Sequence, residues 1–451
     1  MSTNISKTII LDEPLSKDYI IEDISSDELY IRVEAWKRID SFLSKKIITM
    51  KEIRDLRFKL IELLGSYKGN IRKDAWSAFN FLITRKFRLK EDSSKFIDLL
   101  SSKEHSIRVD AWIEAYYLMK GKIVTKIELT HLSNKFIEIL SSEDQRVRLT
   151  AWDGVEYLVR KKIIPKKKVV SLLDKFFELL KSDDEEIRNS AWGNLLLLGG
   201  GSIITRRDAS KFIEILSSED QRVRLTAWSY FDFILIKRII PKRGLIVPKR
   251  KLVSLLDKFF ELLKSDDEEI RKSAWETIYR LKLKKVITRR DASKFIEILS
   301  SEDQRVRLTA WIDFDTTIFK KTIPKRKVVS LLDKFFELLK SDDEEISQSA
   351  WESLSTFGFS KIITRRDASK FIEILNSDDQ KVLVEAWGHI NVFIWTNIIP
   401  KRKIASSSDK IIELLKSDDE EIRKMAKDIV DDLVARNIIE IDDSMTLRAM
   451  D

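Results

Sequence analysis

The chain has 451 residues, of which 43% are hydrophobic, and it carries 83 basic against 74 acidic side chains, a net charge of +9. It contains no cysteine, which excludes disulfide bonds and thiolate metal sites. No apolar run is long enough to span a bilayer, and the first residues lack the pattern of a secretory signal, so we expect a cytoplasmic protein. The frequent Lys, Glu and Ile, without Cys, are typical of thermophilic proteins.

An Ala-Trp pair recurs ten times along the chain, at spacings of 36, 40 or 47 residues. A period in this range is typical of a solenoid, in which each repeat is a supersecondary unit that stacks on the next. We therefore expect an elongated array whose function is binding. The tryptophans are Trp36, Trp76, Trp112, Trp152, Trp192, Trp228, Trp275, Trp311, Trp351 and Trp387.

Each repeat contains two predicted helices. The first is short and amphipathic, and a Ser-Asp-Asp sequence ends it; one example of its apolar face is Phe176, Phe177, Leu179 and Leu180. The second starts in the acidic stretch that follows and is apolar at its positions 1, 5, 9 and 12, as at Val147, Ala151, Val155 and Leu158. This spacing predicts an amphipathic helix of about 16–18 residues. Short loops make the two helices antiparallel, and neighbouring pairs must stack to bury their faces.

About eleven such pairs can be counted over residues 14–437, with an N-terminal extension at 1–13 and a C-terminal tail at 438–451. They resemble HEAT repeats in their apolar first helix, their turn Asp, and the Ile-Arg and Ala of the second helix: Leu172, Leu173, Phe176, Leu179, Leu180, Asp183, Ile187, Arg188 and Ala191. The resemblance implies an all-α, right-handed α-solenoid of about eleven stacked antiparallel helix pairs. Armadillo-like arrays are the near alternative.

The resemblance also implies that the turn Asp and the helix Arg pair between neighbouring repeats. The Asp is absent before Ile71 and Ile107, and the Arg is replaced by Ser347 and by Leu383, so we expect an interrupted ladder.

The repeated tryptophans have two interpretations. They pack between repeats, or they form a row of indoles for stacking on a base or a partner. The last repeat has Lys427 in the Trp position, and it alone has no following neighbour. Terminal repeats of a solenoid become polar, so this replacement favours packing.

Basic residues cluster in the turns between repeats, which would form a basic edge of the array. Solvated charges that complement the helix dipoles are one interpretation, and a track for nucleic-acid phosphates is the other. The residues are Lys166, Lys167, Lys168, Arg206, Arg207, Lys249, Arg250, Lys251, Arg289, Arg290, Lys325, Arg326, Lys327, Arg365, Arg366, Lys401, Arg402 and Lys403.

Near-identical repeats diverge after their tryptophan. Residues 210–228 equal residues 293–311 at all 19 positions, whereas the next ten residues agree at only three. Positions 7, 10 and 14 of the second helix point away from the core and carry much of this change. Relaxed drift is one explanation, and a concave recognition surface for a protein partner is the other. The candidate partner-binding residues are Tyr116, Tyr157, Leu196, Tyr279, Ile312, Phe319, Phe359 and Trp395.

The three histidines are scattered, and no phosphate-binding loop, zinc-protease motif or nucleophile elbow occurs. We therefore expect no enzyme activity, no cofactor and no metal. The main hypothesis is a scaffold or adaptor that binds a protein partner through the second helices. The alternative is an RNA- or DNA-binding or ribosome-associated protein that uses the basic edge. The oligomeric state stays open.

Overall fold

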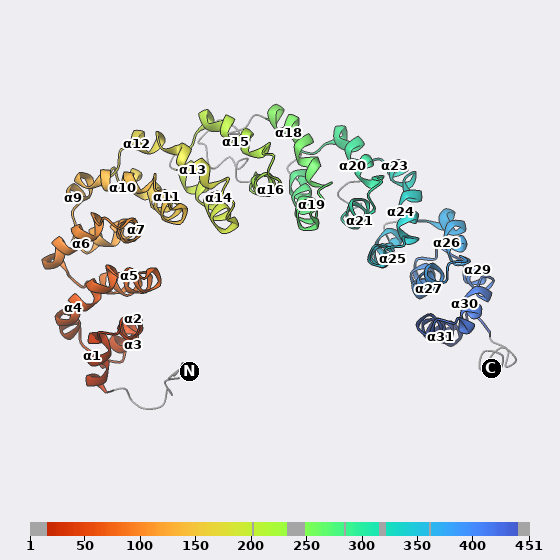
Figure 1. Cartoon of the computed structure of the whole chain (residues 1–451), viewed down its shortest axis with the longest axis horizontal. Coiled ribbons are helices and arrows are strands. Elements are labelled where there is room, and N and C mark those ends of the chain that lie inside the picture. The colour runs from red at the N-terminus through yellow and green to blue at the C-terminus, as the bar shows by residue number, and fades with distance from the viewer. Residues whose placement is uncertain are drawn as a thin grey trace. The chain divides into compact units, whose positions relative to one another are not determined.

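Figure 1 shows the computed structural model of the chain, which describes residues 16–200, 203–231, 249–283, 286–314, 322–359 and 362–440. Within these ranges the regular structure is α-helix with short 3-10 turns, and no strand occurs there. The helices follow one another as stacked pairs, which confirms the predicted all-α solenoid. The described residues divide into two compact units, residues 16–215 and residues 216–440. The predicted extension at 1–13 lies outside the described residues, as does most of the predicted tail.

Unit 1 holds five complete pairs and the start of a sixth. In Figure 1, its second helices lie on the inner side of the curve that this unit makes. Its first helices are α1 (Lys17–Ser25), α4 (Met50–Leu64), η1 with α6 (Lys90–Asp92, Ser93–Leu100), α9 with α10 (Lys126–His131, Ser133–Ile139), α12 with α13 (Lys166–Val170, Leu173–Leu179) and η2 with α15 (Arg206–Asp208, Ala209–Leu216). Its second helices are α2 with α3 (Leu29–Lys37, Ile39–Ser44), α5 (Gly69–Thr84), α7 with α8 (His105–Ile113, Ala115–Lys120), α11 (Gln145–Arg160) and α14 (Glu185–Gly200).

Unit 2 continues the same alternation. Its first helices are α18 (Lys249–Leu262), η3 with α20 (Arg289–Asp291, Ala292–Leu299), α23 with α24 (Lys325–Val329, Leu332–Leu339), η4 with α26 (Arg365–Asp367, Ala368–Ile374) and α29 with α30 and η5 (Lys401–Ala405, Asp409–Glu413, Leu414–Lys416). Its second helices are α16 (Gln221–Ser229), α19 (Glu268–Leu283), α21 (Gln304–Ile312), α25 (Glu344–Phe359), α27 with α28 (Gln380–Gly388, Ile390–Thr396) and α31 (Glu420–Ala435).

The second helices begin and end at defined capping residues. The side chain of Asp144 accepts hydrogen bonds from the backbone N–H groups of Arg146 and Val147 at 2.9 and 3.1 Å, and so starts α11. At the other end, Lys162 adopts a left-handed conformation with φ 56°, and Ile163 N–H donates to the Leu158 carbonyl at 2.9 Å. This Schellman geometry satisfies the last carbonyls and turns the chain toward the next repeat. Lys46, Lys86, Lys122, Asn397 and Asn437 hold the same conformation at equivalent positions.

We expect Lys162→Gly to stabilise unit 1. A non-glycine residue in the left-handed region costs about 1 kcal/mol or more, and glycine removes that cost. The gain should be about 1 kcal/mol, or roughly 2–4 °C in the melting temperature of a unit this size. Thermal unfolding followed by circular dichroism measures it. The control is Lys161→Gly, since Lys161 has φ −77° and gains nothing from glycine; equal shifts for both variants would contradict the assignment.

The tryptophans form the inter-repeat core. All ten are at most 3% exposed. The indole of Trp152 donates from Nε1 to the Leu140 carbonyl at the end of its own first helix, at 3.3 Å, and its ring lies 5.1 Å from that of Phe176 in the next repeat. Trp112 repeats both contacts, with the Leu100 carbonyl and with Phe136. The packing interpretation is therefore confirmed: the indole caps one helix and faces the following repeat, where no partner could stack on it.

The expected pairing of the turn Asp with the buried helix Arg is wrong in detail. Arg148 is 3% exposed, donates from Nη1 to the Ser142 carbonyl of its own turn at 2.8 Å, and lies 3.4 Å from Glu178 of the next repeat. The expected turn residue, Asp183, makes no salt bridge with the described residues. Its neighbour Asp184 meets a different arginine, Arg146, at 3.5 Å. The Asp–Arg contact thus lies one residue later in the turn and two residues earlier on the second helix than expected, while the buried guanidinium satisfies a carbonyl of its own turn.

Two types of repeat alternate along each unit. The QRVR type has Gln-Arg-Val-Arg at the start of its second helix, as at residues 304–307, and the DDEEI type has Asp-Asp-Glu-Glu-Ile there, as at residues 342–346. The two types make two kinds of polar contact with each other. From the QRVR type to the DDEEI type, the contact joins second helices and turns, as in Arg305 to Asp343 at 3.4 Å and Ser341 Oγ donating to Gln304 at 2.5 Å. In the other direction it joins first helices, as in Lys340 to Glu373 at 3.0 Å. The two ion pairs are largely exposed and contribute little stability.

Candidate functional site

Four of the predicted partner-binding residues are exposed on second helices. The exposed fractions are 44% for Tyr116, 47% for Tyr279, 47% for Ile312 and 68% for Trp395. Tyr157 is half-buried. The side chains of Leu196 and Phe359, and Phe319 as a whole, lie outside the described residues.

In unit 1 the structure brings two of these residues together. Tyr116 on α8 and Tyr157 on α11 meet edge to face, with ring centroids 5.8 Å apart, and Tyr117 lies 5.0 Å from Tyr116. Lys120 lies over the ring of Tyr116 at 5.8 Å, and Arg160 lies over that of Tyr157 at the same distance. The cluster spans two neighbouring repeats and presents both aromatic and cationic groups.

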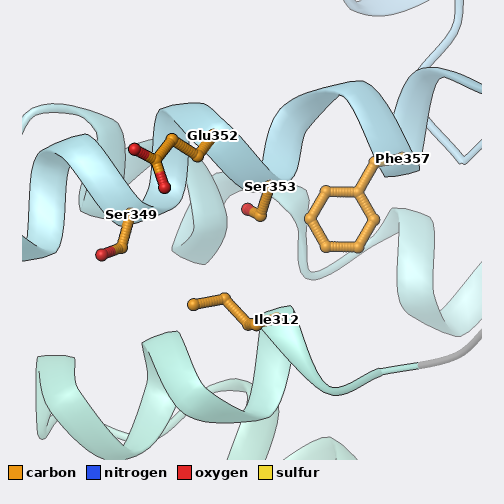
Figure 2. Close-up of a pocket in the computed structure, with 5 residues that line it drawn as sticks. All are labelled: Ile312, Ser349, Glu352, Ser353 and Phe357. Atoms are coloured by element: carbon orange, nitrogen blue, oxygen red, sulfur yellow. The ribbon is translucent and has the colours of Figure 1, made fainter.

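In unit 2 Ile312 lies at the centre of a groove. Figure 2 shows Ile312, at the end of α21, facing Ser349, Glu352, Ser353 and Phe357 of α25. These five residues line a cavity of about 280 Å³. A second cavity of about 300 Å³ shares Ile312 and Ser349 and extends the groove to α19. Three successive second helices therefore form one continuous groove with an apolar centre.

The flanks of this groove are acidic. Asp313 and Glu276 line it, and neither makes a salt bridge with the described residues. Lys272 and Arg305 also line it, but they are paired with Glu268 at 2.5 Å and Asp343 at 3.4 Å. The third cation of the lining, Arg271, is buried and donates to the Ser265 carbonyl at 2.6 Å. The acids of the lining outnumber its bases, with Glu268, Glu276, Asp313 and Glu345 against Arg271, Lys272 and Arg305.

Burial among the helices of the groove raises the pKa of Asp313 to about 6; Lys272 opposes this shift and Glu276 adds to it. The folded protein thus holds this proton more tightly than the unfolded chain, whose value is 3.8. As pH rises from about 4 to about 6, ionisation of Asp313 lowers the free energy of unfolding. Above pH 6 this loss of stability stays constant.

We therefore expect Asp313→Asn to stabilise unit 2 at pH 8 by less than about 1 kcal/mol, because the groove encloses the Asp313 side chain only in part and solvent still screens its charge. The difference in melting temperature between variant and wild type should disappear at pH 4. Melting curves at the two pH values measure it. Glu302→Gln, at an exposed carboxylate on the turn before α21, is the control and should show no such pH dependence. An Asp313→Asn gain of equal size at both pH values would contradict the raised pKa.

Sequence reasoning identified Ile312 but missed Asp313, Glu276, Ser349, Glu352, Ser353 and Phe357. Phe357 occupies position 12 of its helix and was expected only as a core residue. The others are polar residues on different repeats, and their proximity follows from the stacking of three helices.

The predicted basic edge has a different local setting from the expected one. The sequence suggested that these bases lie at the end of the second helix, where their positive charge would interact favourably with the helix dipole. In the structure, three of the clusters instead open the first helices α12, α23 and α29; they are Lys166–Lys168, Lys325–Lys327 and Lys401–Lys403. Three arginine pairs lie in the 3-10 turns before α15, α20 and α26; they are Arg206–Arg207, Arg289–Arg290 and Arg365–Arg366. Each of α12, α23 and α29 has only five residues, so its bases lie near both of its ends and the helix dipole does not decide between the two interpretations.

Most of these basic side chains are exposed. Lys249, Arg250 and Lys251 lie in the first turn of α18, but their side chains and that of Arg206 are outside the described part. No described helix is long and apolar enough to cross a membrane.

Comparison with solved structures identifies the class of protein. Kap121p matches with a TM-score of 0.55 at 15% identity, over 92% of this chain and 45% of Kap121p. Kap121p bound to Pho4p gives 0.55 at 15%, over 91% and 45%, and the Kap95:Nup1 complex gives 0.54 at 13%, over 92% and 56%. The chain has the HEAT-repeat α-solenoid fold of these karyopherins and spans about half of their length. No protein-family model and no curated protein matches it.

Proposed function

We propose that the protein is a non-enzymatic scaffold that binds a protein partner through its second helices. The observation that carries this proposal is the groove across α19, α21 and α25, with the half-exposed Ile312 at its centre. An isoleucine exposed in a concave site gains contact area when a partner covers it, as in the centre of a protein interface. The solved relatives bound to Pho4p, Nup53p and Ulp1p are protein complexes on the same fold.

The divergence of duplicated repeats supports the same surface. Two of the three QRVRLTAW repeats are identical over the residues that lead to Trp228 and Trp311, and they differ from the next residue on, with Ser229 in one and Ile312 in the other. Both residues follow a buried tryptophan whose packing is common to the two repeats. The difference therefore changes the exposed side of the helix without changing its core.

A comparison of captured proteins tests the proposal. Tagged full-length protein is used to isolate partners from the native lysate after nuclease treatment, in parallel with Ile312→Glu and with Tyr67→Glu. Tyr67 is 83% exposed in a turn of unit 1, so its variant has the same added charge away from the groove. We expect a protein that is retained by wild type and by Tyr67→Glu, and lost with Ile312→Glu. The proposal would be contradicted if wild type and both variants captured the same proteins, or if nuclease treatment abolished the capture.

A further inference from the structure

The basic side chains converge at one place in unit 2 that the proposed protein-binding groove does not use. Lys325 and Arg326 open α23, and Arg365 and Arg366 lie in η4 of the following repeat. The four residues line one open hollow of about 950 Å³, together with Val329, Ile362, Thr364 and Asp367. Two consecutive repeats thus contribute two cations each to a common site.

The charges of Arg326 and Arg366 are not neutralised by the described residues of the hollow. Asp367 is the one acid among those residues, and its carboxylate already accepts hydrogen bonds from Thr364, from the backbone N–H at 2.8 Å and from Oγ1 at 3.2 Å. Arg365 uses its Nε to bind the Asn397 carbonyl at 3.0 Å, which leaves its terminal nitrogens available and holds the side chain in place. Arg326 and Arg366 are exposed and make no salt bridge with the described residues.

The cations of this hollow belong to a sequence pattern that recurs along the chain. Lys325 and Arg326 open the five-residue helix α23. The sequence Pro-Lys-Lys-Lys opens α12 in unit 1 in the same way, and Arg207 follows in the next 3-10 turn. Basic residues thus occur at the same places in both units where a DDEEI repeat precedes a QRVR repeat.

We propose that the hollow formed by Lys325, Arg326, Arg365 and Arg366 binds the phosphate backbone of a nucleic acid. Guanidinium groups bind phosphate oxygens in a bidentate manner, and two pairs of cations from separate repeats suit more than one phosphate. Among the described residues, the lining includes no aromatic side chain on which a base could stack, so we expect contact to the backbone that does not depend on the base sequence.

Fluorescence anisotropy with the full-length protein tests this site. The probes are a fluorescein-labelled single strand of 20 nucleotides and the matching duplex, titrated between 50 and 200 mM NaCl. We expect log K to fall linearly with log salt, by roughly 0.7 per phosphate contact for the single strand and 0.9 for the duplex. In the double variant R326Q/R366Q the slope should decrease by about 1.5–2, and affinity at 50 mM should fall at least about tenfold.

The matched control is K381Q/K424Q, which removes the same charge from two exposed lysines on second helices of unit 2. It should keep the wild-type slope, and circular dichroism should show both variants folded. The proposal is overturned if neither probe binds at 50 mM salt, or if the control loses as much affinity as R326Q/R366Q. It is equally overturned if a poly-glutamate peptide binds as tightly as the nucleic acids, since the hollow would then recognise an acidic protein segment.

Discussion

Replacing Trp152 by alanine should lower the free energy of unfolding of unit 1 by roughly 3–5 kcal/mol. The indole is 1% exposed, packs against Phe176 of the next repeat, and is the hydrogen-bond donor to the Leu140 carbonyl. The variant loses the buried ring, leaves a cavity between two repeats, and leaves that carbonyl without its indole donor. Because solenoid stability depends on contacts between neighbours, the loss should also reduce the cooperativity of unfolding. Urea unfolding followed by circular dichroism measures both effects.

Trp395→Ala is the matched control for this experiment. Trp395 is the one tryptophan outside the Ala-Trp pairs and is 68% exposed on α28. We expect its removal to change stability by less than about 0.5 kcal/mol. A Trp152→Ala protein with an unchanged unfolding midpoint and no partner binding would reverse the conclusion and make the repeated tryptophans contact residues.

The packing role of the tryptophans could be predicted from the sequence because the last repeat lacks the tryptophan. Lys427 stands in the tryptophan position of the last repeat, on α31, which has no following second helix among the described residues. A residue that is kept in the other repeats and lost at the end must act on the neighbour that follows. The period and the apolar spacing of Val147, Ala151, Val155 and Leu158 were sufficient for the fold, and all four residues are buried.

Helix boundaries were predicted less completely. Six second helices have the expected length of 16 residues, namely α5, α11, α14, α19, α25 and α31. In three repeats the helix is interrupted two residues after the tryptophan, at Arg38, Glu114 and His389, where ψ is close to 0°. The apolar pattern is the same in both groups, so periodicity alone did not distinguish them.

The binding surfaces could be predicted only in part, because proximity between repeats is not visible in one repeat. Ile312 was identified by its divergence from Ser229, but the acids beside it come from other repeats. The basic clusters were found from composition, whereas their position at the start of first helices depends on where the second helix ends. That end is set by the left-handed residue at Lys162 and its equivalents, and a lysine is not the glycine that usually marks such a turn.

Arg307→Ala should lower the stability of unit 2 by about 2–4 kcal/mol. Arg307 is 2% exposed and donates from Nη1 to the Ser301 carbonyl at 2.6 Å, while its Nη2 lies 3.3 Å from Glu337 of the next repeat. The variant leaves a half-buried carbonyl without its donor, which costs about 1–3 kcal/mol, and removes the packing of the arginine stem.

The partner of this arginine separates the two contributions. Glu337 is half-exposed, so Glu337→Gln removes two solvent-screened ion pairs, with Arg307 and with Lys334, and should cost less than about 1 kcal/mol. Urea unfolding of both single variants and of the double variant gives the coupling energy between the two side chains. If Glu337→Gln were as destabilising as Arg307→Ala, the ion pair between repeats would dominate. If, as we expect, it is mild, the buried arginines act mainly within their own repeats, fixing the turn from which each second helix starts.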